Sequence, residues 1–209
     1  RALEHDPTRP AHEAPVDLYL WTGRRDQALD VAERALERDP RSPYAHADVA
    51  RVLQLMNRCD EALTHLDQVA RGNRPTRTAE TRALCHAQAG RWNEAIAAAR
   101  AAITPSDSSS VSLLAWLLHR AGNSNQAAPL RQVVVDRVRR GRASAVDLAL
   151  LDAGARDFDA AARRVQEAVD ARSFVMAAGV DFVMLTGPVF QELHRRPAFI
   201  EARKRLGYP

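Results

Sequence analysis

The sequence contains little of what membrane-spanning or disulfide-stabilised proteins require. Its 209 residues include no apolar run of about 20 residues, which excludes a helix that crosses a membrane. Two cysteines cannot build a disulfide framework. Aromatic residues make up only 5% of the chain, and Lys204 is the only lysine among 30 basic residues. With 46% hydrophobic and 27% charged residues, the composition is still that of a folded globular protein.

Motifs of catalysis and metal binding are missing as well. The chain has no Walker loop and no Gly-x-Gly-x-x-Gly, Gly-x-Ser-x-Gly or His-Glu-x-x-His motif. Its seven histidines include no His-x3-His pair, and Cys59 and Cys85 lie far apart in the sequence, whereas a metal site needs three or four convergent ligands. We therefore predict no catalytic activity, no cofactor and no metal. Both thiols are interpreted as reduced, packed side chains.

The basic residues do not form a pattern typical of nucleic-acid binding. The formal net charge is only +4. Arginines cluster at 131–142 and at 195–205, but Asp136 and Glu201 interrupt the two clusters. Nucleic-acid binding requires a contiguous basic face, so we interpret both clusters as solvated helix surfaces.

A repeat of 32 to 34 residues runs through most of the chain. Alanines recur at spacings of 34, 33, 32 and 34 residues, at Ala28, Ala62, Ala95, Ala127 and Ala161. Five positions before each alanine lies a turn residue, which is glycine or asparagine in four units and Arg156 in the fifth. Glycine and asparagine tolerate the positive φ at which many helices end. Each unit therefore predicts a helix, a tight turn and a second helix.

This unit resembles the tetratricopeptide repeat. The resemblance is carried by Gly23-Arg24-Arg25-Asp26-Gln27-Ala28-Leu29 with Ala35-Leu36-Glu37-Arg38-Asp39-Pro40, and by Gly90-Arg91-Trp92-Asn93-Glu94-Ala95-Ile96. It covers about residues 1–171 and implies an all-α, right-handed solenoid of helical hairpins. We expect five helix pairs, at about 10–40, 43–74, 76–105, 108–140 and 142–171. Residues 1–9 look like the tail of an upstream repeat, so we expect the array to continue before residue 1.

Two prolines interrupt the pattern of helices. Pro15 lies within the first predicted helix, which we expect to start at this residue and to be short. Pro129 lies within the second helix of the fourth unit, which is expected either to begin at Pro129 or to be kinked there.

The C-terminal residues 173–209 leave the repeat. Apolar residues from Phe174 to Leu185 predict a helix or helix pair, Gly187-Pro188 breaks it, and short helices follow. A stacked array must cover its last apolar face, so we interpret residues 173–209 as a helical cap. The run from Gly187 to Phe199 is similar to the ends of tetratricopeptide regions in bacterial signalling and transcription regulators. That similarity implies an effector domain outside this chain.

In the family that the unit resembles, the first helices line a groove that holds a partner peptide or helix. By position, this implies a partner-binding groove made of Tyr44, Asp48, Arg51, Arg77, Glu80, Thr81, Gln88, Ser112, Trp116 and His119. Trp116 is either an interface anchor or a core residue between alanine-rich helices. The family's clamp for a C-terminal carboxylate uses Lys and Asn at four-residue spacing in the first helices, and this chain has no such pair. Arg51 and Arg77 could bind a carboxylate bidentately instead.

We therefore predict a non-catalytic scaffold that binds a protein, a peptide or a neighbouring domain of its own chain. Three alternatives stay open. The first is a regulatory or sensor region of a bacterial transcription regulator or cyclase. The second is an oligomerisation module that forms a homodimer through the apolar residues 174–199. The third is a nucleic-acid binder that uses the two arginine clusters. Two unpaired thiols favour the cytoplasm, although repeat sensors also face the periplasm.

Overall fold

The described part of the chain consists of helices joined by short turns. The computed structural model describes residues 13–69, 75–103, 107–170 and 183–208, and these contain no β-strand. Their repeat helices are α1 (Glu13–Trp21), α2 (Arg25–Arg38), α3 (Pro43–Leu55), α4 (Cys59–Asp67), α5 (Pro75–Gln88), α6 (Trp92–Ala102), α7 (Ser108–Arg120), α8 (Ser124–Arg139), α9 (Ala145–Gly154) and α10 (Phe158–Asp170). The predicted all-α fold is confirmed.

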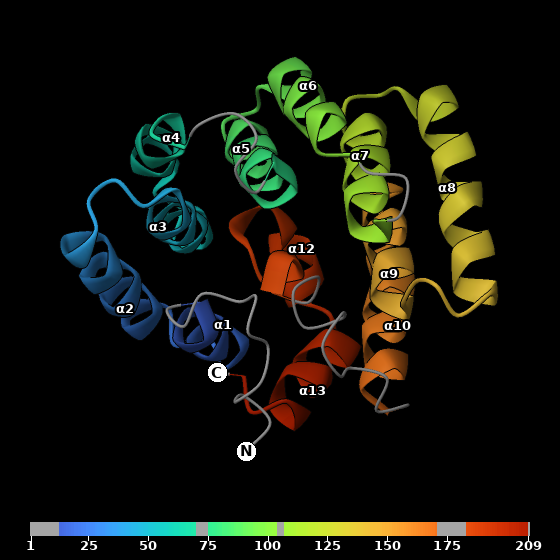
Figure 1. Cartoon of the computed structure of the whole chain (residues 1–209). Coiled ribbons are helices and arrows are strands. Elements are labelled where there is room, and N and C mark those ends of the chain that lie inside the picture. The colour runs from blue at the N-terminus through green and yellow to red at the C-terminus, as the bar shows by residue number, and fades with distance from the viewer. Residues whose placement is uncertain (1–12, 70–74, 104–106, 171–182, 209) are drawn as a thin grey trace.

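These helices form an arch of antiparallel pairs (Figure 1). The first helices of successive pairs contact one another along the inner side, from α1 through α3, α5 and α7 to α9. In the first four pairs the second helices, α2, α4, α6 and α8, lie on the outer side of the arch. The arrangement is the helical solenoid that the repeat predicts.

Small residues hold the two helices of each pair together. The five repeated alanines are all 0% exposed: Ala28, Ala62, Ala95, Ala127 and Ala161. A larger side chain at such a close contact would push the helices apart and would typically cost about 1–3 kcal/mol. The repeat in the sequence is therefore a repeat of close helix contacts.

The turn within each pair uses a residue with left-handed backbone. The φ angle is 72° at Gly23 and Gly90, 63° at Asn57 and 82° at Gly122. Arg156 adopts the same conformation, with a φ of 63°, although its Cβ makes it unfavourable by about 1–2 kcal/mol. Packing of the pair therefore imposes this turn even where the local residue disfavours it.

The prolines occur at different places in their helices from those expected. α1 begins at Glu13, so Pro15 lies in its first turn, where an amide hydrogen would have no helical partner. α8 runs from Ser124 to Arg139 and continues through Pro129, so the expectation that this helix begins at Pro129 is wrong. The predicted tail at 1–9 lies outside the described residues.

The C-terminal segment, residues 183–208, folds back into the arch (Figure 1). It contains η1 (Pro188–Phe190), α12 (Gln191–His194) and α13 (Pro197–Arg205). α13 packs on α10, as a cap on the last pair would, and η1 contacts α5 in the middle of the arch. In the first pair of the arch, Arg25 of α2 donates hydrogen bonds to the carbonyl oxygens of Leu55 (2.7 Å) and Thr186 (2.8 Å). The segment therefore connects the first pairs with the last.

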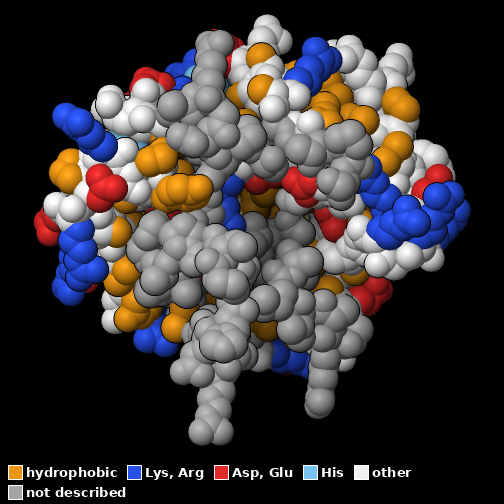
Figure 2. All heavy atoms as spheres, viewed as in Figure 1, with side chains coloured by type: hydrophobic (Ala, Val, Ile, Leu, Met, Phe, Trp, Pro, Cys, Tyr) orange, Lys and Arg blue, Asp and Glu red, His pale blue; other side chains and the backbone are white. Residues whose placement is uncertain are grey.

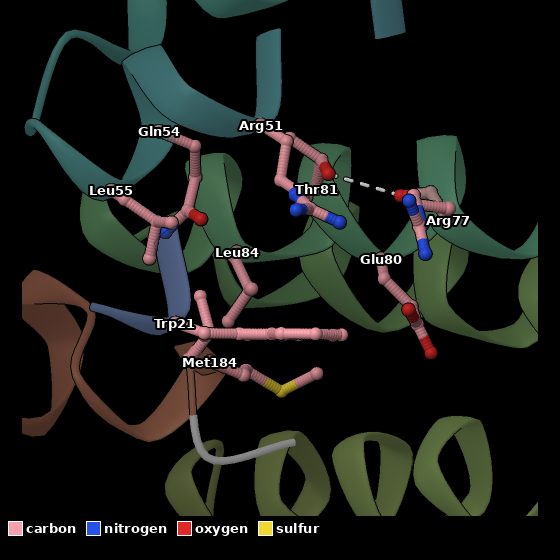
Figure 3. Close-up of a pocket in the computed structure, with 10 residues that line it drawn as sticks. Trp21, Arg51, Gln54, Leu55, Arg77, Glu80, Thr81, Leu84 and Met184 are labelled. Atoms are coloured by element: carbon pink, nitrogen blue, oxygen red, sulfur yellow. Dashed lines mark hydrogen bonds between the residues drawn. The ribbon is translucent and has the colours of Figure 1, made fainter. Parts of the chain in front are cut away.

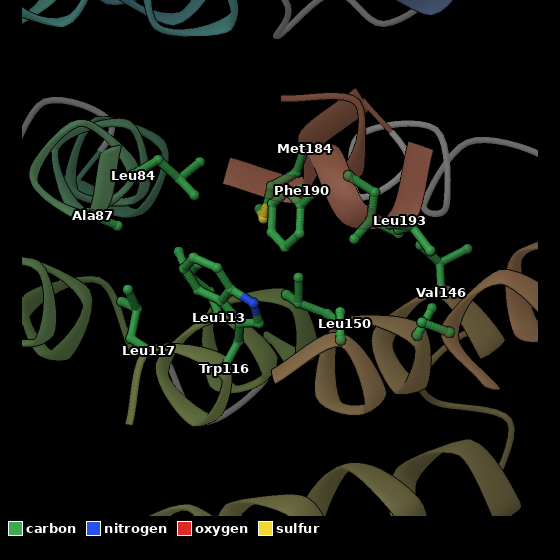
Figure 4. Packing of buried hydrophobic residues seen from close by; sticks show 14 of the residues in the cluster. Leu84, Ala87, Leu113, Trp116, Leu117, Val146, Leu150, Met184, Phe190 and Leu193 are labelled. Atoms are coloured by element: carbon green, nitrogen blue, oxygen red, sulfur yellow. The ribbon is translucent and has the colours of Figure 1, made fainter. Parts of the chain in front are cut away.

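Large apolar side chains of this segment fill the inside of the arch. Leu185, Phe190, Leu193 and Phe199 are at most 1% exposed. The ring centroids of Phe190 and Trp116 lie 4.9 Å apart, and Figure 4 shows the two rings facing each other across the core. The described part of the apolar segment predicted for self-association is therefore a core and not an exposed surface. Its remaining part, 174–182, lies outside the described residues.

Candidate binding site on the inner face

The residues predicted to form a groove come from the inner helices α3, α5 and α7. Their exposure differs from that of an open groove, because most of them are covered within the chain. Tyr44 is 37% exposed, and Arg77, Gln88 and His119 are partly exposed. The other six are buried: Asp48, Arg51, Glu80, Thr81, Ser112 and Trp116.

On the α7 side the predicted groove residues belong to the core. Trp116 is 2% exposed and contacts Phe190 and Trp92, with its ring centroid 6.3 Å from that of Trp92. Of the two interpretations of Trp116, the structure shows the core residue. Ser112 is 0% exposed and donates a hydrogen bond to Asp147 Oδ1 (3.4 Å). The C-terminal segment thus closes this half of the inner face.

On the α3 and α5 side the structure brings four of the predicted residues together around a cavity. The cavity has a volume of about 40 Å³, with room for about three water molecules. It is lined by the predicted Arg51, Arg77, Glu80 and Thr81 and by Trp21, Gln54, Leu55, Leu84, Val183 and Met184. Figure 3 shows these side chains, and a hollow with charged and hydrophobic side chains is visible near the middle of the face in Figure 2. We call this site the inner cavity.

Charged groups from three neighbouring repeats meet beside the inner cavity. Asp17 of α1 accepts a hydrogen bond from Arg51 Nη2, and this carboxylate is 3% exposed. Arg77 Nη1 lies 3.9 Å from the same Asp17 oxygen. One buried carboxylate therefore holds two guanidinium groups at the cavity.

Several buried polar atoms at the cavity have unused hydrogen-bonding capacity. Within the described residues, no partner is found for Arg51 Nε, Arg51 Nη1, Gln54 Nε2 or Glu80 Oε1. Arg51 is 7% exposed, Gln54 2% and Glu80 9%, so bulk solvent has little access to these atoms. A buried polar group without a partner costs about 1–3 kcal/mol. The cavity is therefore a place where a ligand with hydrogen-bonding groups would gain contacts.

Glu80 is mostly protonated at pH 7, because its pKa is raised to about 8. Burial raises the pKa of its carboxyl group to about 8, and Asp107 raises it further, against the opposing effect of Arg77 and Arg51. A neutral carboxyl group both donates and accepts hydrogen bonds. The cavity thus combines cationic hydrogen-bond donors with one carboxyl group that can either donate or accept a hydrogen bond.

Sequence reasoning missed Asp17, Gln54, Trp21 and Met184. A signal existed for Asp17, because it precedes Arg51 by 34 residues and so occupies the same repeat position one unit earlier. Equivalent positions on adjacent inner helices are neighbours in a solenoid. No such signal exists for Met184, which comes from outside the repeat.

Two further observations limit the chemistry of the described residues. No group of three or more histidine, cysteine, aspartate or glutamate side chains in the described ranges is placed to hold a metal ion. None of the described helices is long and apolar enough to cross a membrane.

Fold and site together define an α-helical repeat scaffold. Residues 19–85 match the family profile described as tetratricopeptide repeat, and this range contains most of the inner cavity. One similar solved structure comes from the functional characterization of Pseudomonas aeruginosa pilF. It is 21% identical, with a TM-score of 0.54, over 93% of this chain and 97% of that one. No curated protein matches the sequence.

Residues 19–85 therefore match the tetratricopeptide repeat that the sequence pattern predicts, and the rest of the described chain shares the fold of a helical-repeat protein. The likeness to the solved structure extends the shared fold beyond the residues that match the family profile. Repeats of this kind support a general role as a scaffold for protein–protein interaction.

Proposed function

We propose that this protein is a non-catalytic scaffold that binds a segment of a protein partner at the inner cavity. One observation carries the proposal. A cavity on the inner face of three adjacent repeats is lined by buried polar atoms that lack partners, on Arg51, Gln54 and Glu80. Such atoms favour a ligand that supplies the missing hydrogen bonds.

The unpaired donors suggest what the partner presents. Arg51 and Gln54 offer N–H groups, so the partner group is a hydrogen-bond acceptor such as a carboxylate or amide oxygen. Neutral Glu80 can donate to the same group. Apolar side chains of Trp21, Leu84 and Met184 line the rest of the cavity. A side chain with an apolar stem and an accepting end would match both parts.

The C-terminal segment stays in place when the partner binds. Displacing it would expose Leu185, Phe190, Leu193 and Phe199, which are now at most 1% exposed. At about 2–3 kcal/mol for each side chain, this would cost roughly 10 kcal/mol. A cost of that size is comparable with the whole stability of a typical domain, about 5–15 kcal/mol. The partner therefore binds to the closed structure and does not displace the C-terminal segment.

Two substitutions in the cavity test the proposal with a matched control. The cavity variant Gln54→Leu/Thr81→Val removes polar groups at nearly constant volume. The control variant Gln68→Leu/Thr64→Val makes the same changes at Thr64 of α4 and at Gln68 directly after it, and both residues are exposed. The control is well matched, because the hydroxyl groups of Thr81 and Thr64 each donate a hydrogen bond to the carbonyl oxygen four residues earlier, at 3.0 and 3.1 Å.

The assay starts from a nuclease-treated lysate of the source cells, passed over the immobilised protein. A retained partner is then purified and titrated calorimetrically against the wild type and both variants. Loss of the Gln54 donor leaves a buried acceptor of the partner unpaired, which costs about 1–3 kcal/mol and predicts an affinity about tenfold lower for the cavity variant and unchanged for the control. Equal affinity for the wild type and the cavity variant would refute the proposal. Helical content, measured by circular dichroism, must agree in all three proteins.

The cytoplasm is the location we propose for this activity, because both cysteines are free thiols. The role of a regulatory region within a longer chain is compatible with the same site, because the partner would then be a domain of that chain. A gene sequence that extends upstream of Arg1 into an effector domain would favour this form of the proposal.

A further inference from the structure

A second surface lies where the two helices of each pair are joined. Two adjoining hollows, of about 480 and 270 Å³, run between these turns and the C-terminal segment. Asn57, Pro188 and Gln191 line both hollows and so connect them. The first hollow reaches Arg25 in the first pair, and the second reaches Arg120 in the fourth. We call the two together the rim groove.

The rim groove is positively charged. Its described lining contains Arg25, Arg120 and Arg203 but no aspartate or glutamate. The guanidinium group of Arg25 donates to carbonyl oxygens, while those of Arg120 and Arg203 lie over the rings of Trp92 and Tyr208, at 5.7 and 5.2 Å. Among the described residues none of the three forms an ion pair with a carboxylate, so their charges act on whatever occupies the groove.

Neighbouring titratable groups respond to this positive potential. Burial and the nearby Arg156 lower the pKa of Arg120. Burial also lowers the pKa of His194, with Arg203 and Arg25 acting in the same direction and a hydrogen bond to the Leu185 carbonyl opposing them. Both groups lose part of their affinity for protons mainly because they are buried, and the nearby arginines act in the same direction.

Three helices begin at arginines that directly adjoin lining residues in the sequence, and these arginines add to the positive charge at a cost in stability. The N-cap residues of α2, α4 and α6 are Arg24, Arg58 and Arg91, and none makes a side-chain capping hydrogen bond. A cation at a helix N-terminus is unfavourable, because the helix dipole already places positive charge there. Arg58 is compensated by Glu61, at 2.7 Å, whereas Arg24 and Arg91 have no carboxylate partner among the described residues. Residues that disfavour the fold in this way are expected at functional surfaces.

Amide side chains in the groove suit a polypeptide. Asn57 and Gln191 line both hollows, and within the described ranges neither side chain forms a hydrogen bond. An amide can donate to a peptide carbonyl and accept from a peptide N–H, whereas a phosphate offers only acceptors. The groove passes four repeats whose inner helices are spaced about 9–10 Å apart, so it is roughly 30 Å long. At about 3.3 Å per residue, an extended segment of about eight or nine residues fits this length.

From this charge and shape we infer that the rim groove binds an extended acidic segment of a protein partner. The inference does not depend on the inner cavity, which shares only Leu55 with the described lining of the rim groove. Arginine side chains and helix N-termini attract the carboxylates of the segment, and the two amides hold its backbone.

The test uses defined peptides in place of an unidentified partner. A fluorescein-labelled (Ser-Glu)5 peptide is titrated with the full chain at low salt and followed by fluorescence anisotropy. (Ser-Gln)5 is the neutral control, and labelled dT10 tests for binding of nucleic acid. The rim variant is Arg24→Gln/Arg91→Gln/Arg120→Gln. The matched control is Arg38→Gln/Arg100→Gln/Arg140→Gln. It removes the same charge at the C-terminal ends of α2, α6 and α8.

We expect (Ser-Glu)5 to bind at least tenfold more tightly than (Ser-Gln)5. The rim variant should lose about tenfold in affinity, and the control less than threefold. Equal losses in the two variants, no binding of (Ser-Glu)5, or tighter binding of dT10 would each overturn the inference. The cavity variant Gln54→Leu/Thr81→Val should bind (Ser-Glu)5 as the wild type does, and a loss there would place the peptide in the inner cavity instead. Failure of this test and failure of the cavity test are therefore distinguishable.

Discussion

Replacing Glu80 by glutamine tests whether its carboxyl group is neutral in the folded protein. Burial and Asp107 raise the pKa of Glu80 to about 8 from an ordinary value of 4.5, although Arg77 and Arg51 oppose the change. Glutamine has nearly the same shape as the neutral acid. Glu80→Gln should therefore change little in the folded protein below pH 8, while it removes a group that ionises in the unfolded chain.

The sign and size follow from proton linkage. Because the folded pKa is raised, the unfolded chain releases the Glu80 proton first, and the wild type loses stability as the pH rises from 4.5 to 8. The two pKa values differ by 3.5, and at 1.36 kcal/mol for each unit the full loss is about 5 kcal/mol. At pH 7 the loss is about 3 kcal/mol. The variant should therefore match the wild type near pH 4 and exceed it increasingly up to pH 8.

Urea denaturation followed by circular dichroism at pH 5, 6, 7 and 8 measures this difference in the free energy of unfolding. Other titrating groups are common to both proteins and cancel in the difference. Glu94→Gln, at an exposed glutamate of α6, is the control and should show a difference that does not vary with pH. A difference for Glu80→Gln that stays constant from pH 5 to 8 would refute a neutral, buried Glu80.

Three further predictions concern the turns, the core and the thiols. Arg156→Gly should raise the free energy of unfolding by about 0.5–1 kcal/mol, because glycine removes the strain of a positive φ; a lower melting temperature would contradict this. Phe190→Ala should lower that free energy by about 3–5 kcal/mol, because the ring is 1% exposed. A loss below 1 kcal/mol in urea denaturation would mean that the C-terminal segment does not belong to the core. Iodoacetamide should alkylate Cys59 in the folded protein, since this thiol is partly exposed and a hydrogen bond from Cys85 lowers its pKa. Cys85 is 0% exposed and should react only after unfolding, and equal rates by peptide mass mapping would contradict its burial.

The repeat could be predicted from the sequence because its physical causes are local and periodic. Ala28 and its four equivalents are small because two helices touch there, and all are 0% exposed. Gly23 and its equivalents precede them because the turn needs a positive φ. Arg156 breaks the sequence pattern but keeps the geometry, since the helices on both sides determine the turn. Because several positions in each unit recur with the same period, the repeat can be recognised even where one unit has Arg156 at the turn.

The course of the C-terminal segment could not be predicted in the same way. Its contacts join residues that are far apart in sequence, such as Arg25 and Thr186. Phe190 has no repeat partner that would indicate Trp116 as its neighbour, so aromatic character alone left Trp116 open between groove and core. Only the folded chain shows that a segment outside the repeats fills half of the inner face.

The inner cavity could be predicted only in part. Arg51, Arg77, Glu80 and Thr81 were found by their repeat positions, because equivalent residues on adjacent inner helices come together. The burial of Arg51, Glu80 and Thr81 was not predicted, because Val183 and Met184 from outside the repeats line the same cavity. Repeat position thus identifies which residues meet, and the segment outside the repeat decides how much solvent reaches them.

Both candidate surfaces therefore depend on the C-terminal segment as much as on the repeats. Met184 forms part of the inner cavity, and Pro188 and Gln191 form one wall of the rim groove. The same segment buries Phe190 and Phe199 in the core. Deleting it would remove both binding surfaces and destabilise the fold together, so a truncated chain that fails to bind would give no information about either surface. Substitutions that keep the segment, at Gln54 and Thr81 for one surface and at the rim arginines for the other, separate binding from folding.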